Sequence, residues 1–276
     1  MAGAGLVPFL AYLVLFLALP TVLSLTSGVL VDGQVRLDNL SALADPVIAT
    51  TFWNATWLSL LTAGLGAAIG ALVCYALLGL PETGAVRTVT DAASGVLAQV
   101  GGVMLAFAFI ATIGQKGVLT LFLSSAGVDI FASGVWIYDM PGLVLPYLYF
   151  QVPLMVITFS PAMAALKPAW AEANLTLGGT RRTFWARIGL PVLAPSFLAS
   201  ALLLFANAFS SYATAAALIS QGSQIVTLQI RTALTSETVL GRQNLAGVLA
   251  LGMIVVIAVV MAAYAAVQRV AARWQS

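Results

Sequence analysis

Residues 171–191 read AEANLTLGGTRRTFWARIGLP, a short polar stretch in a chain that is otherwise mostly apolar. Lys167-Pro168 before it predicts a helix start, because proline lacks the N–H that a first helical turn leaves unpaired. Residues 169–177 tolerate a helix, and Gly178-Gly179 predicts its end, because glycine adopts the left-handed conformation at little cost. We therefore expect Glu172 to lie in the first turn, near the positive end of the helix dipole.

A second short helix is expected to follow these glycines. Thr180 can cap it, and the pattern predicts helix from Arg181 to about Arg187, before Pro191 opens the next apolar stretch. Taken singly, Glu172 could be an ordinary helix-start charge, and the arginines could be positive charge retained on the cytoplasmic side of a membrane.

Composition sets the class of protein. The 276 residues are 61% hydrophobic and only 7% charged, which is far from a soluble domain. Each of six uncharged stretches exceeds the roughly 20 residues that cross a bilayer as a helix. They cover residues 1–31, 46–81, 92–115, 140–166, 189–230 and 243–268. We predict an all-α, polytopic membrane protein with six transmembrane helices, forming a single domain over residues 1–276.

The individual spans carry further expectations. The first apolar stretch is too long for a signal peptide and lacks a basic leader, so we expect a retained span. The third is expected over about 92–113, with Gly101-Gly102 allowing close contact with another helix. The apolar part of residues 114–140 predicts a short helix at the membrane surface. The fourth span, about 141–165, contains three prolines and should be kinked.

The long stretch over residues 189–230 has room for two spans. Ser210-Ser211 and the polar run at residues 221–224 favour one span followed by a polar re-entrant or external segment.

The basic residues predict the orientation. With both termini in the cytoplasm, seven basic residues lie inside and four outside, in accord with the positive-inside rule. The inside group is Arg87, Lys167, Arg181, Arg182, Arg187, Arg269 and Arg273, and the outside group is Arg36, Lys116, Arg231 and Arg242.

Several chemistries are disfavoured by composition. The chain has no histidine and one cysteine, Cys74, so we expect no metal site and no catalytic residues. Neither lysine, Lys116 nor Lys167, stands in the G-K-[ST] pattern that binds nucleotide phosphates, so the chain is not expected to be an ATPase. The spans lack central ionisable groups, which disfavours an ion-coupled carrier. The arginines follow topology and form no nucleic-acid patch.

Polar residues within apolar stretches are candidates for a substrate pathway, because unpaired amides and hydroxyls are costly in lipid. The alternative for each is an ordinary hydrogen bond between helices. Asn207, Ser211 and Thr214 are expected on one helical face. The candidates are Asn54, Gln151, Asn207, Ser211, Tyr212 and Thr214.

The polar stretch also resembles a family motif. Glu172-Ala173, Gly178 and Ile188-Gly189-Leu190-Pro191 have the spacing of the EAA loop of ABC importer membrane subunits, which reads E-A-A, three residues, G, nine residues, I-x-L-P. Only the third letter differs, with Asn174 in place of alanine. In that family the loop docks on the ATPase subunit. The resemblance implies a coupling role for Glu172, Ala173, Asn174, Gly178, Arg181, Arg182, Ile188, Leu190 and Pro191.

Weaker resemblances lie elsewhere. Residues 37–54 and 113–119 resemble polyamine-type permeases, residues 37–54 especially the first of their paired subunits. Residues 205–218 are similar to the polyamine, iron and phosphonate branch. Together they imply a type I importer (MetI-like) permease fold, with a core over about 52–267 and a cytoplasmic coupling loop at 166–190.

The resemblance also implies partners and a substrate. ATP and Mg would be bound by two separate ATP-binding cassette subunits and not by this chain. A related second permease, favoured over a second copy, and an external solute-binding protein would complete an importer in the bacterial inner membrane. The outer loops around 129–139 and 221–242 are expected to receive the binding protein.

Polyamine is the first expected substrate, followed by iron(III), phosphonate, sulfate or thiamine. The rival hypotheses are a secondary carrier or channel, and a non-transporting membrane scaffold or lipid-acting enzyme.

Overall fold

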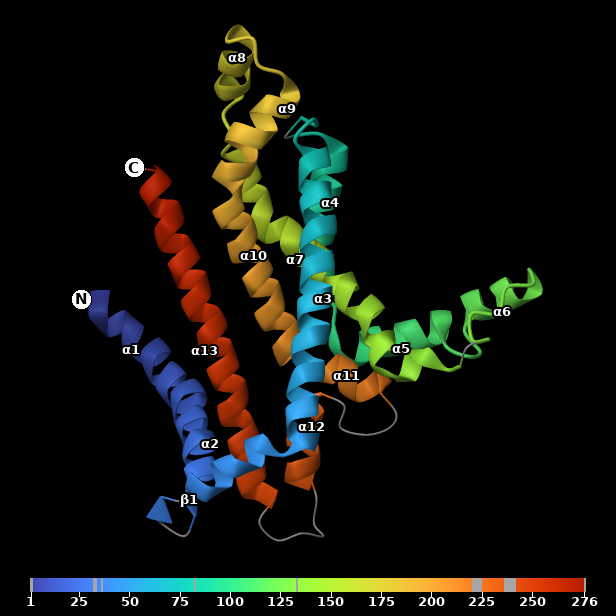
Figure 1. Ribbon diagram of the computed structural model, residues 1–276, viewed down its shortest axis with the longest axis vertical. Coiled ribbons are helices and arrows are strands. Elements are labelled where there is room, and N and C mark those ends of the chain that lie inside the picture. Colours follow the sequence, from blue (N-terminus) through green and yellow to red (C-terminus); the bar gives the residue numbers. More distant parts are fainter. Residues whose placement is uncertain are drawn as a thin grey trace. The chain divides into compact units, whose positions relative to one another are not determined.

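The computed structural model describes residues 2–31, 34–35, 37–81, 83–132, 134–219, 225–235 and 242–275. Nearly all of this is helix, apart from the two-residue antiparallel strands β1 (Leu30–Val31) and β2 (Gln34–Val35) (Figure 1). Six helical segments are long and apolar enough to cross a membrane. They are Leu6–Leu23, Pro46–Leu77, Gly102–Ser125, Met140–Ala164, Arg181–Ser210 and Leu245–Val267. The predicted all-α fold with six spans is confirmed.

The chain divides into two compact units. One contains Met1–Ala55 and Ser223–Ala258, and the other contains Thr56–Gly222 and Val259–Ser276. Two long helices, α3 (Pro46–Leu77) and α13 (Arg242–Gln275), contribute to both.

The first unit begins with an apolar helix that has no buried residue over Leu6–Leu23. It is formed by α1 (Ala2–Leu13), a π-helical turn (Val14–Ala18) and α2 (Leu19–Val29). No residue of the window Leu6–Leu23 is buried, so this helix is open to lipid or to a partner. The other elements of the unit are the 3₁₀ segment Leu37–Ala44 and α12 (Val226–Thr235).

The second unit contains the core that positions the polar hairpin. Helix α7 (Val144–Ala164) follows a 3₁₀ turn (Met140–Leu143) and packs against both α3 and α10 (Leu190–Ser210). On α3, Gly70 permits this approach, because a Cβ there would lie 2.5 Å from the Cβ of Met155. Pro153 and Pro161 lie inside α7, which continues as one helix past both prolines.

The expectation of a continuous third span over 92–113 is wrong. Two helices occupy this region, α4 (Ala85–Leu97) and α5 (Gly102–Ile113), and α6 (Val118–Ser125) follows. The break has a backbone cause, because Gly102 has φ +74, a backbone conformation that residues other than glycine rarely adopt. The expected close helix contact holds at Gly102, where a Cβ would lie 3.5 Å from the Cβ of Ala213.

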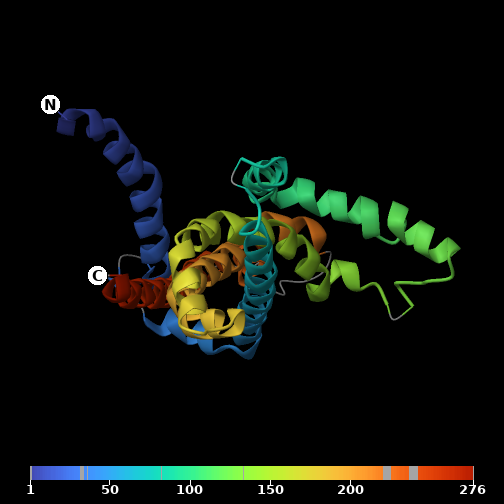
Figure 2. The same ribbon diagram turned by 90° about the horizontal axis from the view of Figure 1, so that it is seen from above.

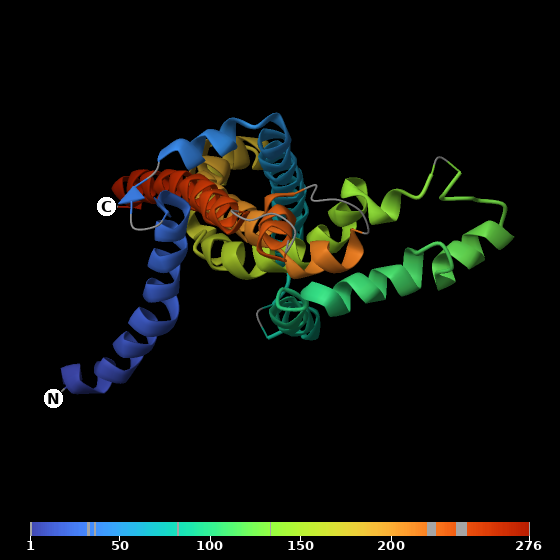
Figure 3. The same cartoon turned by 90° about the horizontal axis from the view of Figure 1, so that it is seen from below.

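A second break separates α10 from the six-residue helix α11 (Ala213–Leu218). Ser211 between them is extended, with φ −68 and ψ 118, so Asn207, Ser211 and Thr214 do not share one helical face as expected. Helix α11 lies beside α5, as Figures 2 and 3 show. Helix α11 reads ATAAAL, and residues 221–224 lie outside the described chain, so the polar re-entrant or external segment stays a prediction.

Candidate functional site

The polar stretch forms a helical hairpin between α7 and α10 (Figure 1). Helix α8 (Pro168–Thr176) begins at Pro168 as predicted, and Gly178, with φ +76, follows its end. Helix α9 (Arg181–Phe184) is capped by Thr180, whose Oγ1 accepts a hydrogen bond from the Thr183 N–H at 3.3 Å. The start, the glycine stop and the cap are all confirmed.

The expected position of Glu172 in the first turn is wrong. It is the fifth residue of α8, because the helix begins at Pro168, and the first turn contains no acidic residue. Dipole stabilisation at the helix start therefore does not explain this carboxylate. Its side chain is exposed, so it is free to meet a partner of the hairpin.

Two large apolar side chains of the hairpin, which the sequence analysis did not single out, are exposed. Leu175 is 64% and Leu177 is 88% exposed, beside the exposed Ala173. These side chains are therefore accessible to another protein. The sequence carried one sign of this exposed pair, namely two leucines in a segment otherwise rich in charged residues and glycine.

Asn174 differs from these exposed groups in its burial. It is the only buried residue of this helix, and its Nδ2 donates to the carbonyl oxygen of Thr180 at 3.1 Å. Of the residues implied to couple to an ATPase, this one faces the hairpin itself.

The hairpin also contacts the end of α3 directly. Arg181 donates from Nη2 to the hydroxyl of Tyr75, and its guanidinium carbon lies 5.8 Å from the centre of the Tyr75 ring. The same ring meets Trp185 edge-on, with 5.2 Å between centroids. Arg181 thus joins α9 to a membrane-spanning helix, whereas Arg182 and Arg187 are simply exposed.

The second helix does not end before Pro191 as expected. A π-helical turn (Trp185–Gly189) joins α9 to α10, and the helix runs unbroken over Arg181–Ser210. Proline cannot donate the backbone bond of a regular α-helix, and the π-turn lies directly before it, where such a bond would be lost. Ile188, Leu190 and Pro191 are therefore part of a helix rather than of a loop.

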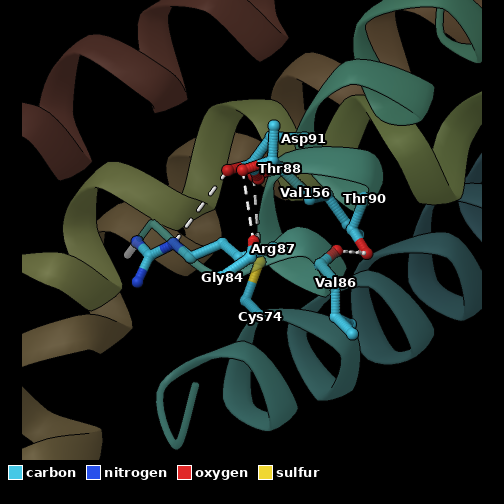
Figure 4. A network of polar contacts seen from close by, with 8 residues as sticks. All are labelled: Cys74, Gly84, Val86, Arg87, Thr88, Thr90, Asp91 and Val156. Carbon is cyan, nitrogen blue, oxygen red and sulfur yellow. Dashed lines mark hydrogen bonds and ion pairs between the residues drawn. The ribbon is translucent and has the colours of Figure 1, made fainter. Parts of the chain in front are cut away.

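Helix α4 lies against α7 near the hairpin end of this unit. Figure 4 shows Arg87 and Asp91 of α4 paired, at 4.0 Å, with Cys74 of α3 and Val156 of α7 close by. A pocket of about 390 Å³ between α4 and α7 is lined by Arg87, Asp91, Ser94, Gly95, Val156, Ile157, Ser160, Pro161 and Ala164. None of the six pathway candidates lines it.

The pathway candidates are dispersed. Gln151 is fully buried, and its Nε2 donates to Thr62 Oγ1 at 2.9 Å, which is an interhelical bond between α7 and α3. Thr214 is buried and accepts from the Gly102 N–H at 2.9 Å. Asn207 and Tyr212 are exposed, Ser211 is half-buried, and the half-buried Asn54 belongs to the other unit.

Comparison with known proteins supports a transport class. No protein-family model matches the chain. The molybdenum transport system permease protein ModB of Mycobacterium tuberculosis is 28% identical over 113 residues, which are 41% of this chain and 39% of ModB. The sulfate transport system permease protein CysT of Synechocystis is 27% identical over 205 residues, which are 73% of this chain and 66% of CysT.

Solved structures share the fold. A chain of a bacterial ABC transporter involved in the import of the acidic polysaccharide alginate matches with a TM-score of 0.72 at 16% identity, covering 99% of this chain and 95% of that one. The alginate transporter in complex with a periplasmic protein that holds an alginate pentasaccharide matches with a TM-score of 0.70 at 17% identity, over 94% and 90% of the two chains.

These matches define the class. The fold is that of ABC transporter membrane chains, and the sequence relatives are transport permeases rather than enzymes. The six apolar helices and these relatives indicate a multi-pass inner-membrane protein. The expected polyamine, iron and phosphonate branch is not supported, because the relatives are named for molybdenum and sulfate.

Proposed function

We propose that this chain is a permease subunit of an ATP-driven importer that depends on an external solute-binding protein. The observation that carries the proposal is the α8–α9 hairpin. It exposes Glu172, Leu175 and Leu177 and is continuous with a membrane-spanning helix. A separate ATPase would cover these groups, because two exposed leucines gain free energy when another protein removes them from water.

The hairpin is connected so that movement of a docked ATPase would reach two spans. Helix α9 runs without a break into α10 through the π-helical turn. Arg181 also holds the end of α3 through Tyr75. A displacement of α8 and α9 would therefore tilt α10 and pull on α3 together. The permease contributes only different affinities for substrate in its two states, and no covalent step.

The complete importer would contain more than this chain. Two ATPase subunits would bind ATP and Mg, and a second permease would supply the other half of the pathway. The apolar first helix, with no buried residue over Leu6–Leu23, is suited to contact that second permease. We propose a different, related chain in this role. A purified complex with two copies of this chain and no other permease would contradict the heterodimer alone.

We propose that the termini are cytoplasmic, which places the hairpin on the side where ATP is available. A cysteine introduced at Thr180 should react with a membrane-impermeant thiol reagent only from the cytoplasmic side. A cysteine at Gln224, outside the described residues, should react only from the opposite side. Labelling of both positions from one side would contradict this orientation.

For the substrate we propose a small inorganic oxyanion of the sulfate or molybdate type. The relatives named for sulfate and molybdenum support this class. Composition supports it too, since none of the six candidate spans contains Asp or Glu. A multivalent cation would find no opposite charge there, whereas backbone N–H and hydroxyl donors suit an oxyanion.

The test is purification of this chain with the products of neighbouring transport genes, followed by reconstitution in vesicles. We expect a stoichiometric ATPase and ATP-dependent uptake of labelled sulfate or molybdate when the loaded binding protein is present. Uptake without any ATPase would indicate a carrier or channel. Absence of both uptake and ATPase would indicate the scaffold. Uptake of putrescine in preference to the oxyanions would overturn only the substrate.

A further inference from the structure

The side chain of Asn174 differs from its neighbours on α8 in where it lies. Glu172, Ala173 and Leu175 are exposed, whereas Asn174 is only 9% exposed. An amide at this burial requires hydrogen-bond partners, because an unpaired buried polar group is costly. Its partner lies across the turn, at the start of the next helix.

Three contacts join Asn174 to that turn. Its side-chain Nδ2 donates to the backbone carbonyl oxygen of Thr180 at 3.1 Å, and the backbone carbonyl oxygen of Asn174 accepts from the Gly179 N–H at 2.8 Å. Its amide also covers Gly179, where an added Cβ would lie 2.2 Å from Oδ1. Position 179 therefore has to remain glycine while the amide is in place.

The acceptor of this bond belongs to the first turn of α9. The Thr180 carbonyl oxygen also accepts from the Phe184 N–H at 2.9 Å. A carbonyl oxygen has two lone pairs and can serve both donors. One oxygen atom thus receives a donor from α8 and a donor from α9, and so fixes the two helices to each other.

We propose that Asn174 is a positioning residue that sets the angle between α8 and α9 and thereby aims the docking surface of Glu172, Leu175 and Leu177. The proposal deepens the proposed coupling function and rests on it. Gly178-Gly179 would otherwise leave the turn with two freely rotating residues. The alanine of the EAA pattern lacks the amide, so this chain has an interhelical contact in the hairpin that alanine cannot supply.

The geometric test uses spin labels and does not depend on transport. Labels at Ala169→Cys on α8 and Val192→Cys on α10, in a Cys74→Ala background, report the distance between the helices in the purified permease. Asn174→Asp keeps the shape but removes the donor, and Asn174→Ala removes both. We expect the population outside the parental distance to rise about fivefold in each variant, the effect of one net hydrogen bond.

Two further variants make the test specific. Gly179→Ala should displace the amide and give the same broadening, and combining it with Asn174→Ala should add little, since both remove one contact. Thr176→Ala is the control, because its hydroxyl bonds only the Ala173 carbonyl of its own helix, at 2.8 Å. An Asn174→Asp distance distribution equal to that of the parent would overturn the proposal.

The functional arm measures ATPase stimulation by the loaded binding protein in the full complex. We expect a several-fold loss of stimulation for Asn174→Asp with unchanged co-purification of the ATPase, since the docking groups remain. Broadened distances with full stimulation would refute the aiming role. Absence of any ATPase partner for the parent would refute the proposed function and leave the distance result standing.

Discussion

The α8–α9 hairpin and the two helix breaks, at Gly102 and Ser211, all interrupt long apolar stretches of the chain. The hairpin exposes side chains, whereas the breaks direct their backbone groups to partners inside the protein. In the hairpin, the turn at Gly178 leaves Glu172 and Leu177 exposed. At the breaks, Gly102 turns its N–H to the buried Thr214, and Ser211 turns its carbonyl to the hydroxyl of Tyr147, at 3.2 Å. The hairpin thus presents exposed side chains, whereas the backbone groups at the breaks are hydrogen-bonded within the protein.

This difference follows from where backbone groups find partners. Backbone freed at a break in an apolar span has no water to bond, so another helix has to supply the donor or acceptor. Backbone freed in a hairpin outside the membrane can be satisfied by its own cap, as Thr180 does. Variants of the hairpin should therefore affect coupling, and variants of the breaks should affect stability.

The largest effect is expected from the hairpin. The double variant Glu172→Ala, Gly178→Val removes the exposed carboxylate and places a β-branched residue at φ +76. Backbone strain of about 1–3 kcal/mol in the turn should misplace α8 and lower ATPase stimulation by about tenfold or more, while the chain still inserts into the membrane. A normal response to the loaded binding protein would remove the coupling assignment.

The next effect is on stability at the breaks. Thr214→Val should leave the Gly102 N–H without its acceptor and lower the free energy of unfolding by about 1–3 kcal/mol. Thermal unfolding of the purified permease measures this. Thr112→Val is the matched control, because that exposed hydroxyl bonds the Ala108 carbonyl in its own helix. Equal stability of the two variants would show that the break needs no partner.

A smaller effect is expected where the hairpin meets α3. Arg181→Met removes both the hydrogen bond and the cation–π contact to Tyr75, while Tyr75→Phe removes only the hydroxyl. We expect uptake to fall about two- to fivefold for Arg181→Met and less for Tyr75→Phe, in line with an exposed cation–π contact. Arg187→Met, an exposed arginine of the following turn, serves as control. A larger loss for Tyr75→Phe would contradict this order.

The smallest effect is expected at Gln151. Its Oε1 has no partner among the described residues, so Gln151→Met loses only the bond to Thr62. Interhelical bonds of this kind contribute on the order of 0.6 kcal/mol, so stability and uptake should change little. Abolished uptake at unchanged stability would instead place Gln151 in the pathway.

The sequence predicted those features that depend on local backbone chemistry. Pro168, Gly178 and Thr180 act within a few residues of themselves, so the helix start, stop and cap could be derived from their order. Membrane class and span number follow from composition alone, because a hydrocarbon layer selects for length and apolarity. In the hairpin, the expected place of Glu172 in the first turn failed, since its distance from Pro168 already exceeds one turn, and so did the expected end of the second helix before Pro191.

Tertiary structure alone decided where long apolar stretches break and what the polar groups meet. Gly101-Gly102 predicted a close helix contact inside a continuous span, whereas the structure has a break there, at which Thr214 accepts the Gly102 N–H. Asn174 looked like one more coupling residue until its partner at Thr180 was seen. Periodicity records which residues are apolar, but it cannot record which distant donor or acceptor satisfies a freed backbone group.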